Sequence, residues 1–179
     1  MRDNGAKRSE HWPHYENVVP PIAPQVPEEL AASLATLGVP RNFIGKRYRL
    51  SSEVRPVALP AFGTLVQFAD SALGALYLDP SNGKVISPTS ADGPIIVNSS
   101  LRQFDDTVRT VIEMFPFYNR GSSIEERQGV ADRMRSALQL IDPAATVVDS
   151  FWGNYIDDLE IGDFATEDVL ESFGAGGSS

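Results

Sequence analysis

The hydrophobic pattern of this chain changes its period twice, and this change restricts the fold more than any other feature of the sequence. Residues 28–38 place three leucines at helical spacing, with two acids first and a glycine last. Residues 63–98 contain short apolar runs bounded by turn residues, which is typical of strands. From Ser100 onward the helical spacing returns. The order helix, strands, helices predicts an α+β fold with an antiparallel sheet packed against helices.

Four strands are predicted in the middle of the chain, over residues 63–68, 74–78, 84–87 and 94–98. The sequence Asp-Pro-Ser-Asn-Gly at 79–83 separates the second strand from the third. It has proline where a turn begins and Asn-Gly where a positive φ is often needed, so we expect a hairpin there. Pro94 cannot donate to a neighbouring strand, and we therefore place the fourth strand at a sheet edge.

Capping residues predict where the later helices begin. Ser100 with Gln103, and Ser123 with Glu126, match capping boxes that satisfy otherwise unpaired amides. The inner faces of these two helices are predicted to contain Leu101, Phe104, Val108, Val111, Ile112 and Phe115, and then Val130, Met134, Leu138 and Ile141.

A third helix is predicted from Asp142 and Pro143, because an N-cap residue is followed there by proline at the first helical position. We expect this helix to run toward Leu159 and to end at Gly162.

The length of the chain fits one domain with tails. Its 179 residues, of which 42% are hydrophobic, can bury one sizeable core but not two comfortable ones. Several prolines near residue 20 favour extended backbone. We therefore expect a proline-containing tail over residues 1–26, a single α+β domain over 27–171, and a flexible Gly/Ser tail over 172–179.

Composition excludes several kinds of protein. The chain has no cysteine, so it has no disulfide, thiolate metal site or cysteine nucleophile. Its basic N-terminal residues are not followed by an apolar run, and no stretch approaches the roughly 20 apolar residues of a membrane span. These patterns predict a cytoplasmic protein that does not contact membranes.

No catalytic or cofactor-binding motif is recognisable. His11 and His14 are the only histidines, and they lie in the expected tail without a third metal ligand nearby. The Asn82-Gly83-Lys84 sequence lacks the first glycine and the final Ser or Thr of a phosphate-binding loop, and no Gly-x-Ser-x-Gly elbow occurs. We predict a protein that is not an enzyme, with no catalytic residue, no cofactor and no metal.

The net charge of −9 is concentrated at one end of the chain. All 15 lysines and arginines lie at or before Arg135, and they are balanced there by an equal number of acids. The remaining residues carry nine acids and no lysine or arginine. This acidic C-terminal quarter should repel nucleic acid and attract a basic partner, in a manner that salt weakens.

Four of these acids follow a group of aromatic residues. Phe151, Trp152 and Tyr155 precede or interleave with Asp157, Asp158, Glu160 and Asp163. An aromatic anchor surrounded by carboxylates suits recognition of a basic protein, so we predict Trp152 and these four acids as partner-binding residues. Two other interpretations stay open: the acids form an ordinary solvated face, or they perform acid/base chemistry.

Three segments in order carry a resemblance to a known family. They are Gly-Ala-Leu-Tyr-Leu-Asp at 74–79, Asn-Gly-Lys-Val at 82–85, and Ile-Val-Asn-Ser-Ser-Leu-Arg-Gln-Phe at 96–104. Trp152, followed by a helix ending at Gly162, and Leu-Gly-Val-Pro at 37–40 complete the pattern. The chain resembles the SUKH superfamily of bacterial immunity proteins, in particular its fourth subgroup, over about residues 28–165.

The resemblance implies a Smi/Knr-like α+β fold and a function in neutralising a cognate polymorphic toxin by direct binding. Toxins countered by this superfamily are often nucleases or deaminases, whose basic surfaces would complement the acidic quarter. No catalytic residue is carried over from the family. A protein-interaction scaffold of the same fold is the alternative, and the resemblance leaves the oligomeric state open.

Overall fold

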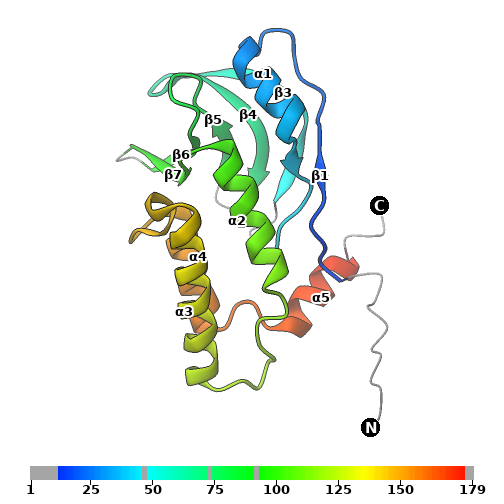
Figure 1. Cartoon of the computed structure of the whole chain (residues 1–179), viewed down its shortest axis with the longest axis vertical. Helices are drawn as coiled ribbons and strands as arrows, with labels where there is room; N and C mark the ends of the chain where they lie inside the picture. The colour runs from blue at the N-terminus through cyan, green and yellow to red at the C-terminus, as the bar shows by residue number, and fades with distance from the viewer. Residues whose placement is uncertain (1–11, 46–47, 72–73, 91–92, 176–179) are drawn as a thin grey trace.

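The structure is a computed structural model that describes residues 12–45, 48–71, 74–90 and 93–175. A five-stranded antiparallel sheet forms the upper part of the molecule (Figure 1). The strands follow one another in chain order, each pairing with the next. They are β3 (Arg49–Leu59), β4 (Gly63–Ser71), β5 (Gly74–Leu78), β6 (Val85–Ser90) and β7 (Gly93–Asn98). A separate two-stranded ladder joins β1 (Asn17–Val18) to β2 (Val39–Pro40).

Helices complete the α+β fold that the sequence predicts. In Figure 1, α2 runs along the sheet, while α3 and α4 lie side by side below β6 and β7. The helices are α1 (Glu28–Leu37), α2 (Leu101–Glu113), α3 (Ile124–Ile141), the short 3₁₀ helix η1 (Pro143–Thr146), α4 (Phe151–Ile161) and α5 (Thr166–Ala175).

Local capping chemistry explains the predicted elements that the structure confirms. The Ser100 hydroxyl accepts a hydrogen bond from the Gln103 amide, and the capping box of Ser123 and Glu126 is complete. The carboxylate of Asp79 accepts hydrogen bonds from the amide and hydroxyl of Ser81 within the predicted hairpin. β7, which contains Pro94, is an edge strand as expected.

The third predicted helix differs from the observed structure. The Asp142 side chain makes no cap hydrogen bond to the helix that follows, because its carboxylate accepts hydrogen bonds from Ser99 instead. Pro143 begins only the short η1, and the chain then turns before α4 begins at Phe151 with Ser150 as its N-cap. The predicted end at Gly162 is confirmed, since this residue adopts the left-handed conformation that closes α4.

The segment expected to be an N-terminal tail packs on the domain from Trp12 onward. Trp12 contacts Phe115 edge to face, with 5.0 Å between ring centroids. Ala23 and Val26 are buried, and the amide of Ala23 donates to the carbonyl of Val54 at the outer edge of β3. The prolines therefore produce an extended segment that covers a sheet edge. Residues 1–11, including His11, lie outside the described residues.

Helix α5, which the sequence did not predict, extends to Ala175 and includes the first residues assigned to the expected C-terminal tail. Thr166 at its start donates from both its amide and its hydroxyl to the carbonyl of Tyr118, which fixes the helix to the loop before α3. Residues 176–179 lie outside the described part of the chain.

The main hydrophobic core lies between the sheet and the helices. Its largest fully buried side chains include Phe68 of the sheet, Phe104 of α2 and Trp152 of α4. A second, smaller cluster of Leu65, Tyr77 and Ile86 forms separately from this core. The predicted inner faces of α2 and α3 are buried, apart from Ile141, which is only partly so.

Candidate functional site

A buried polar network joins the end of β7 to the beginning of α4. The indole nitrogen of Trp152 donates to Oδ1 of Asn98 over 2.9 Å, and the amide nitrogen of the Asn98 side chain donates to Asp142 and Thr107 over 3.2 and 3.1 Å. Asp142 also accepts from the backbone amide and the hydroxyl of Ser99. These bonds connect residues up to 54 positions apart, so the network fixes how the helices meet the sheet.

Trp152 is therefore a core residue, which corrects its prediction as a surface anchor. Its exposed fraction is 0%, and its ring packs against those of Phe43, Phe151 and Tyr155 with centroid separations of 5.6, 5.2 and 5.4 Å. The indole N–H is occupied by Asn98. The side chain offers no surface to a partner in this structure.

The structure places the four predicted acids on and just after α4, but in different surroundings. Asp157 is exposed and lies 3.4 Å from Arg135 of α3, and half-buried Glu160 accepts from Gln128 of α3 over 3.2 Å. Asp163 is exposed beyond the end of α4. Asp158 is half-buried. Two of the four acids thus contact side chains of α3.

The other two acids, Asp158 and Asp163, contribute to the pKa values of two tyrosines. Burial, followed by the charges of Tyr118 and Asp158, raises the pKa of Tyr155 well above its usual range. Burial is also the main cause of the raised pKa of Tyr118, to which Asp163 contributes. The charges of Asp158 and Asp163 thus contribute to the raised pKa values of these tyrosines, whereas Asp157 and Glu160 contact α3.

Acids of α5 form further charged contacts, and the sequence did not indicate them as site residues. Arg120, in the loop before α3, forms ion pairs with Asp168 and Glu171, and its backbone amide donates to Glu167. All of these charged side chains are at least partly exposed. Arg120 and Arg135 therefore balance part of the negative charge of the acidic quarter. The sequence does not indicate these ion pairs, because the partners are far apart along the chain. We call Asp157, Asp158, Glu160, Asp163, Asp168 and Glu171 the acidic surface.

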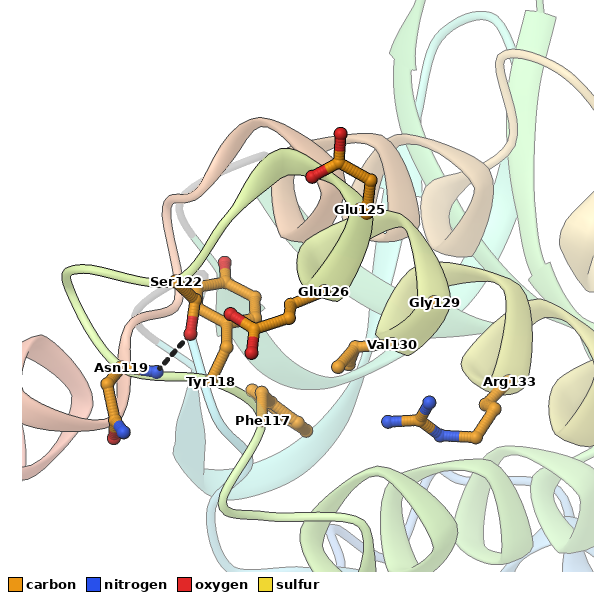
Figure 2. Close-up of a pocket in the computed structure, with 9 residues that line it drawn as sticks. All are labelled: Phe117, Tyr118, Asn119, Ser122, Glu125, Glu126, Gly129, Val130 and Arg133. Carbon is orange, nitrogen blue, oxygen red and sulfur yellow. Dashed lines mark hydrogen bonds between the residues drawn. The ribbon is translucent and has the colours of Figure 1, made fainter.

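A shallow pocket of about 310 Å³ lies beside this surface, between the α2–α3 loop and the first turns of α3 (Figure 2). Phe117, Tyr118 and Val130 contribute buried aromatic and aliphatic side chains to it. Figure 2 shows Glu125 pointing away from the other labelled side chains, while the guanidinium of Arg133 points toward Phe117.

Both carboxyls that line this pocket are held by local hydrogen bonds. Glu126 is held in the capping box of α3. Hydrogen bonds from its own backbone amide and from Ser123 lower the pKa of Glu125, so this carboxyl is ionised and has no proton to donate at neutral pH. Neither carboxyl is placed as a general acid.

Two further searches address metals and membranes. Among the residues that the structure describes, no group of three or more His, Asp or Glu side chains is arranged to hold a metal ion. Within the same part of the chain, no helix is both long enough and apolar enough to cross a membrane.

Comparison with known proteins gives one family match. The model of the SUKH-4 immunity protein family matches residues 18–158, from β1 into α4. All members of the buried network lie within this range, whereas Glu160, Asp163 and the acids of α5 lie beyond it. Searches of curated proteins and of solved structures found no match. Because the family model covers most of the chain, the protein belongs to the SUKH-4 immunity protein family.

Proposed function

We propose that this protein neutralises a cognate bacterial toxin by binding it through the acidic surface, without catalysing a reaction. Membership of an immunity protein family supports the general function. The distribution of charge carries the choice of surface, because nine acids and no lysine or arginine follow Arg135. The partner is a basic toxin domain, such as a nuclease or deaminase that binds nucleic acid.

The ion pairs of the acidic surface are compatible with such binding. The side chains of Asp157 and Arg135 are 65% and 36% exposed, and those of Glu171 and Arg120 are also largely in solvent. Exposed pairs of this kind contribute between about 0 and 1 kcal/mol, so exchanging an internal arginine for one from a toxin costs little. The net negative charge accelerates the approach of a basic partner before contact.

Neutralisation would follow from occupation of the toxin's substrate path. A nuclease or deaminase surface that binds phosphates is basic, and an acidic protein seated on it excludes the nucleic acid. The acids of α4 and α5 are displayed on short helices fixed to the core, so they are presented without a large ordering cost. This mechanism requires no catalytic group on the immunity protein.

The arrangement of the acids supports binding over the acid/base alternative. Asp157 is exposed, and Asp157 and Glu160 are engaged with α3. Asp158 acts instead on Tyr155. Acid/base catalysis requires carboxyls that converge on one substrate position with separated pKa values. Asp157 and Glu160 face α3, whereas Asp163 lies beyond the end of α4, and such a spread suits contact with a broad basic surface.

The test is a titration with a toxin domain from the genomic neighbourhood of this gene, sought there first and prepared in a catalytically inactive form. We expect the combined change Asp157→Asn, Asp158→Asn, Glu160→Gln and Asp163→Asn to weaken binding at least tenfold and to reduce its dependence on salt.

A matched control removes the same charge elsewhere. Glu28→Gln, Glu29→Gln, Glu53→Gln and Glu113→Gln neutralise four exposed acids on α1, β3 and α2. This control should retain the wild-type affinity within a factor of about three. Equal losses for the two variants would indicate an effect of net charge alone and would contradict the proposed surface. Failure of the wild-type protein to bind would contradict the proposed function itself.

A further inference from the structure

A second hollow, distinct from the acidic surface, lies between the edge strand β7 and the loop that precedes α4. Its volume is about 300 Å³. One wall consists of residues 93–96 of β7, and the other consists of residues 144 and 147–150. We call this hollow the β7 groove. Liquid water occupies about 30 Å³ per molecule, so the groove has space for about ten waters or one large side chain.

Two valines beside the groove are strongly exposed. The exposed fractions are 56% for Val147 and 88% for Val148, although both are large aliphatic residues. Across the groove, Pro94, Ile95 and Ile96 extend the apolar surface. Exposed apolar residues that gather around a hollow are typical of sites that another molecule covers.

The loop that carries these valines is held in one position. The amide of Ser150 donates to the carbonyl of Val147 over 3.1 Å, and its hydroxyl donates to the carbonyl of Ala145 over 2.7 Å. A Cβ atom on Gly153 would lie only 2.5 Å from the Val147 carbonyl oxygen, so glycine is needed for this close approach. Asp149 has a φ of 63°, which is uncommon for a residue other than glycine. The valines are therefore presented on a preorganised backbone.

The charge of the groove selects the kind of partner. Among the described residues that line the groove, Asp149 is the only charged one, and it is exposed. No lysine or arginine is among these described lining residues. An apolar groove with a carboxylate at its rim complements an apolar side chain that has a basic neighbour.

The two edges of the sheet differ in a way that favours docking of side chains over strand addition. At β3, the chain itself covers the edge, since Val54 exchanges backbone hydrogen bonds with Pro21 and Ala23. At β7, Pro94 has no amide hydrogen to donate to an added strand. The open edge is thus blunted against strand pairing, while its side chains remain available.

We propose that the β7 groove receives an apolar side chain of the toxin, next to which a basic toxin residue pairs with Asp149. This proposal rests on the toxin-binding function above and assigns a second contact, formed by different residues. The acidic surface accelerates and orients the encounter, and the groove holds the complex together. Buried apolar anchors commonly supply most of the affinity of an interface.

The test uses the same inactive toxin domain and the double change Val147→Ser and Val148→Ser. Both side chains are largely exposed, so the variant should fold with an unchanged melting temperature. We expect its Kd to rise at least tenfold, mainly through faster dissociation. The Asp149→Asn change removes the carboxylate charge, so it should raise Kd about threefold and reduce the salt dependence of binding. Its backbone should be unchanged, because asparagine tolerates the positive φ.

Leu140→Ser is the matched control, because Leu140 is 89% exposed on α3 and does not line the groove. It should leave Kd within a factor of two. Wild-type affinity in the double valine variant would overturn the groove proposal, even if the acid-neutralised variant binds weakly and so upholds the proposed function. If the double valine variant binds normally and the toxin protects the Ile95 and Ile96 amides from hydrogen exchange, the groove proposal is overturned in favour of strand addition at β7. Absence of binding by the wild-type protein would overturn both proposals.

Discussion

Helix α4 has two sides that differ in every physical respect. On one side, Trp152, Tyr155 and Leu159 have exposed fractions of 0% and pack in the core. On the other, Asp157 lies in solvent, held only by an exposed ion pair. A substitution on the first side removes buried contacts, whereas one on the second changes only weakly coupled charge. Neighbouring residues of one helix can therefore have separate functions, one set in the fold and the other in the proposed contact with the toxin.

The same separation distinguishes the sequence pattern of the family from the proposed binding surfaces. Asn98 and Ser99, in the segment that most resembles the family, bond to Asp142, and Asn98 also bonds to Trp152, inside the protein. The acidic surface and the valines of the β7 groove take no part in this network. The buried residues of this segment thus hold the fold together, whereas the residues proposed to contact the toxin are exposed or half-buried and lie outside the network.

A substitution on the buried side of α4 should have the largest effect on stability. Trp152→Ala removes a fully buried indole and leaves Asn98 without one of its partners. We expect a loss of about 3–5 kcal/mol in the free energy of unfolding, measured by urea denaturation. A loss below about 1 kcal/mol would contradict the placement of this residue in the core.

Asn98→Ala should produce the next largest effect. It removes the acceptor of the Trp152 N–H and the donor to Asp142 and Thr107, all within the interior. Leaving buried polar groups unpaired predicts a loss of about 2–3 kcal/mol in the same measurement. Asn119→Ala, on an exposed loop, serves as the control and should change stability by less than about 0.5 kcal/mol. Equal effects in the two variants would exclude a special contribution from the network.

A smaller effect concerns the N-terminal segment and depends on pH. The Tyr15 hydroxyl donates to Asp105, and Arg109 lies over the Tyr15 ring. Burial, followed by the hydrogen bond to Asp105, raises the pKa of Tyr15 from 10.0 to about 12. The folded protein therefore holds this proton more tightly than the unfolded chain, so stability is full below pH 10 and falls as the pH rises toward 12.

Tyr15→Phe isolates this contribution. Other tyrosines also have raised pKa values, so the wild-type protein should lose stability above pH 10 for several reasons. The difference in unfolding free energy between wild type and Tyr15→Phe should therefore be larger at pH 8 than at pH 11.5. Urea denaturation at the two pH values measures it. A difference that grows with pH would show that the sign is wrong.

Much of the fold follows from local rules that the sequence displays. The cap at Ser100, the capping box at Ser123 and the turn at 79–83 act within three or four residues and form as predicted. The predicted second half of the Ser100 box does not form, because the Gln103 side chain donates to the carbonyl of Ile141 instead. The break before α4 was missed because the Asp142 carboxylate is occupied by Ser99, 43 residues earlier. β3 was missed because charged residues and Pro56 interrupt the alternation of its side chains.

The candidate site was harder to predict, since burial depends on which face of a helix meets the core. Trp152, Tyr155, Ile156 and Leu159 recur at helical spacing, and this signal already places the tryptophan on the inner face. The contacts of Arg120 with α5 span 48 and 51 residues, and nothing in the local sequence indicates them. The exposure of Val147 and Val148 was likewise not predicted, because the sequence contains no recognisable signal for the left-handed turn at Asp149.

The central claim is that folding and toxin binding rest on different residues, and one calorimetric comparison tests it most directly. The inactive toxin domain is titrated into wild type, Asn98→Ala and the four-acid variant, at a temperature where all three are folded. We predict that Asn98→Ala binds with the wild-type Kd despite its lower stability, while the four-acid variant binds at least tenfold more weakly with an unchanged melting temperature. The opposite pattern, weak binding by folded Asn98→Ala and full binding by the four-acid variant, would contradict the claim.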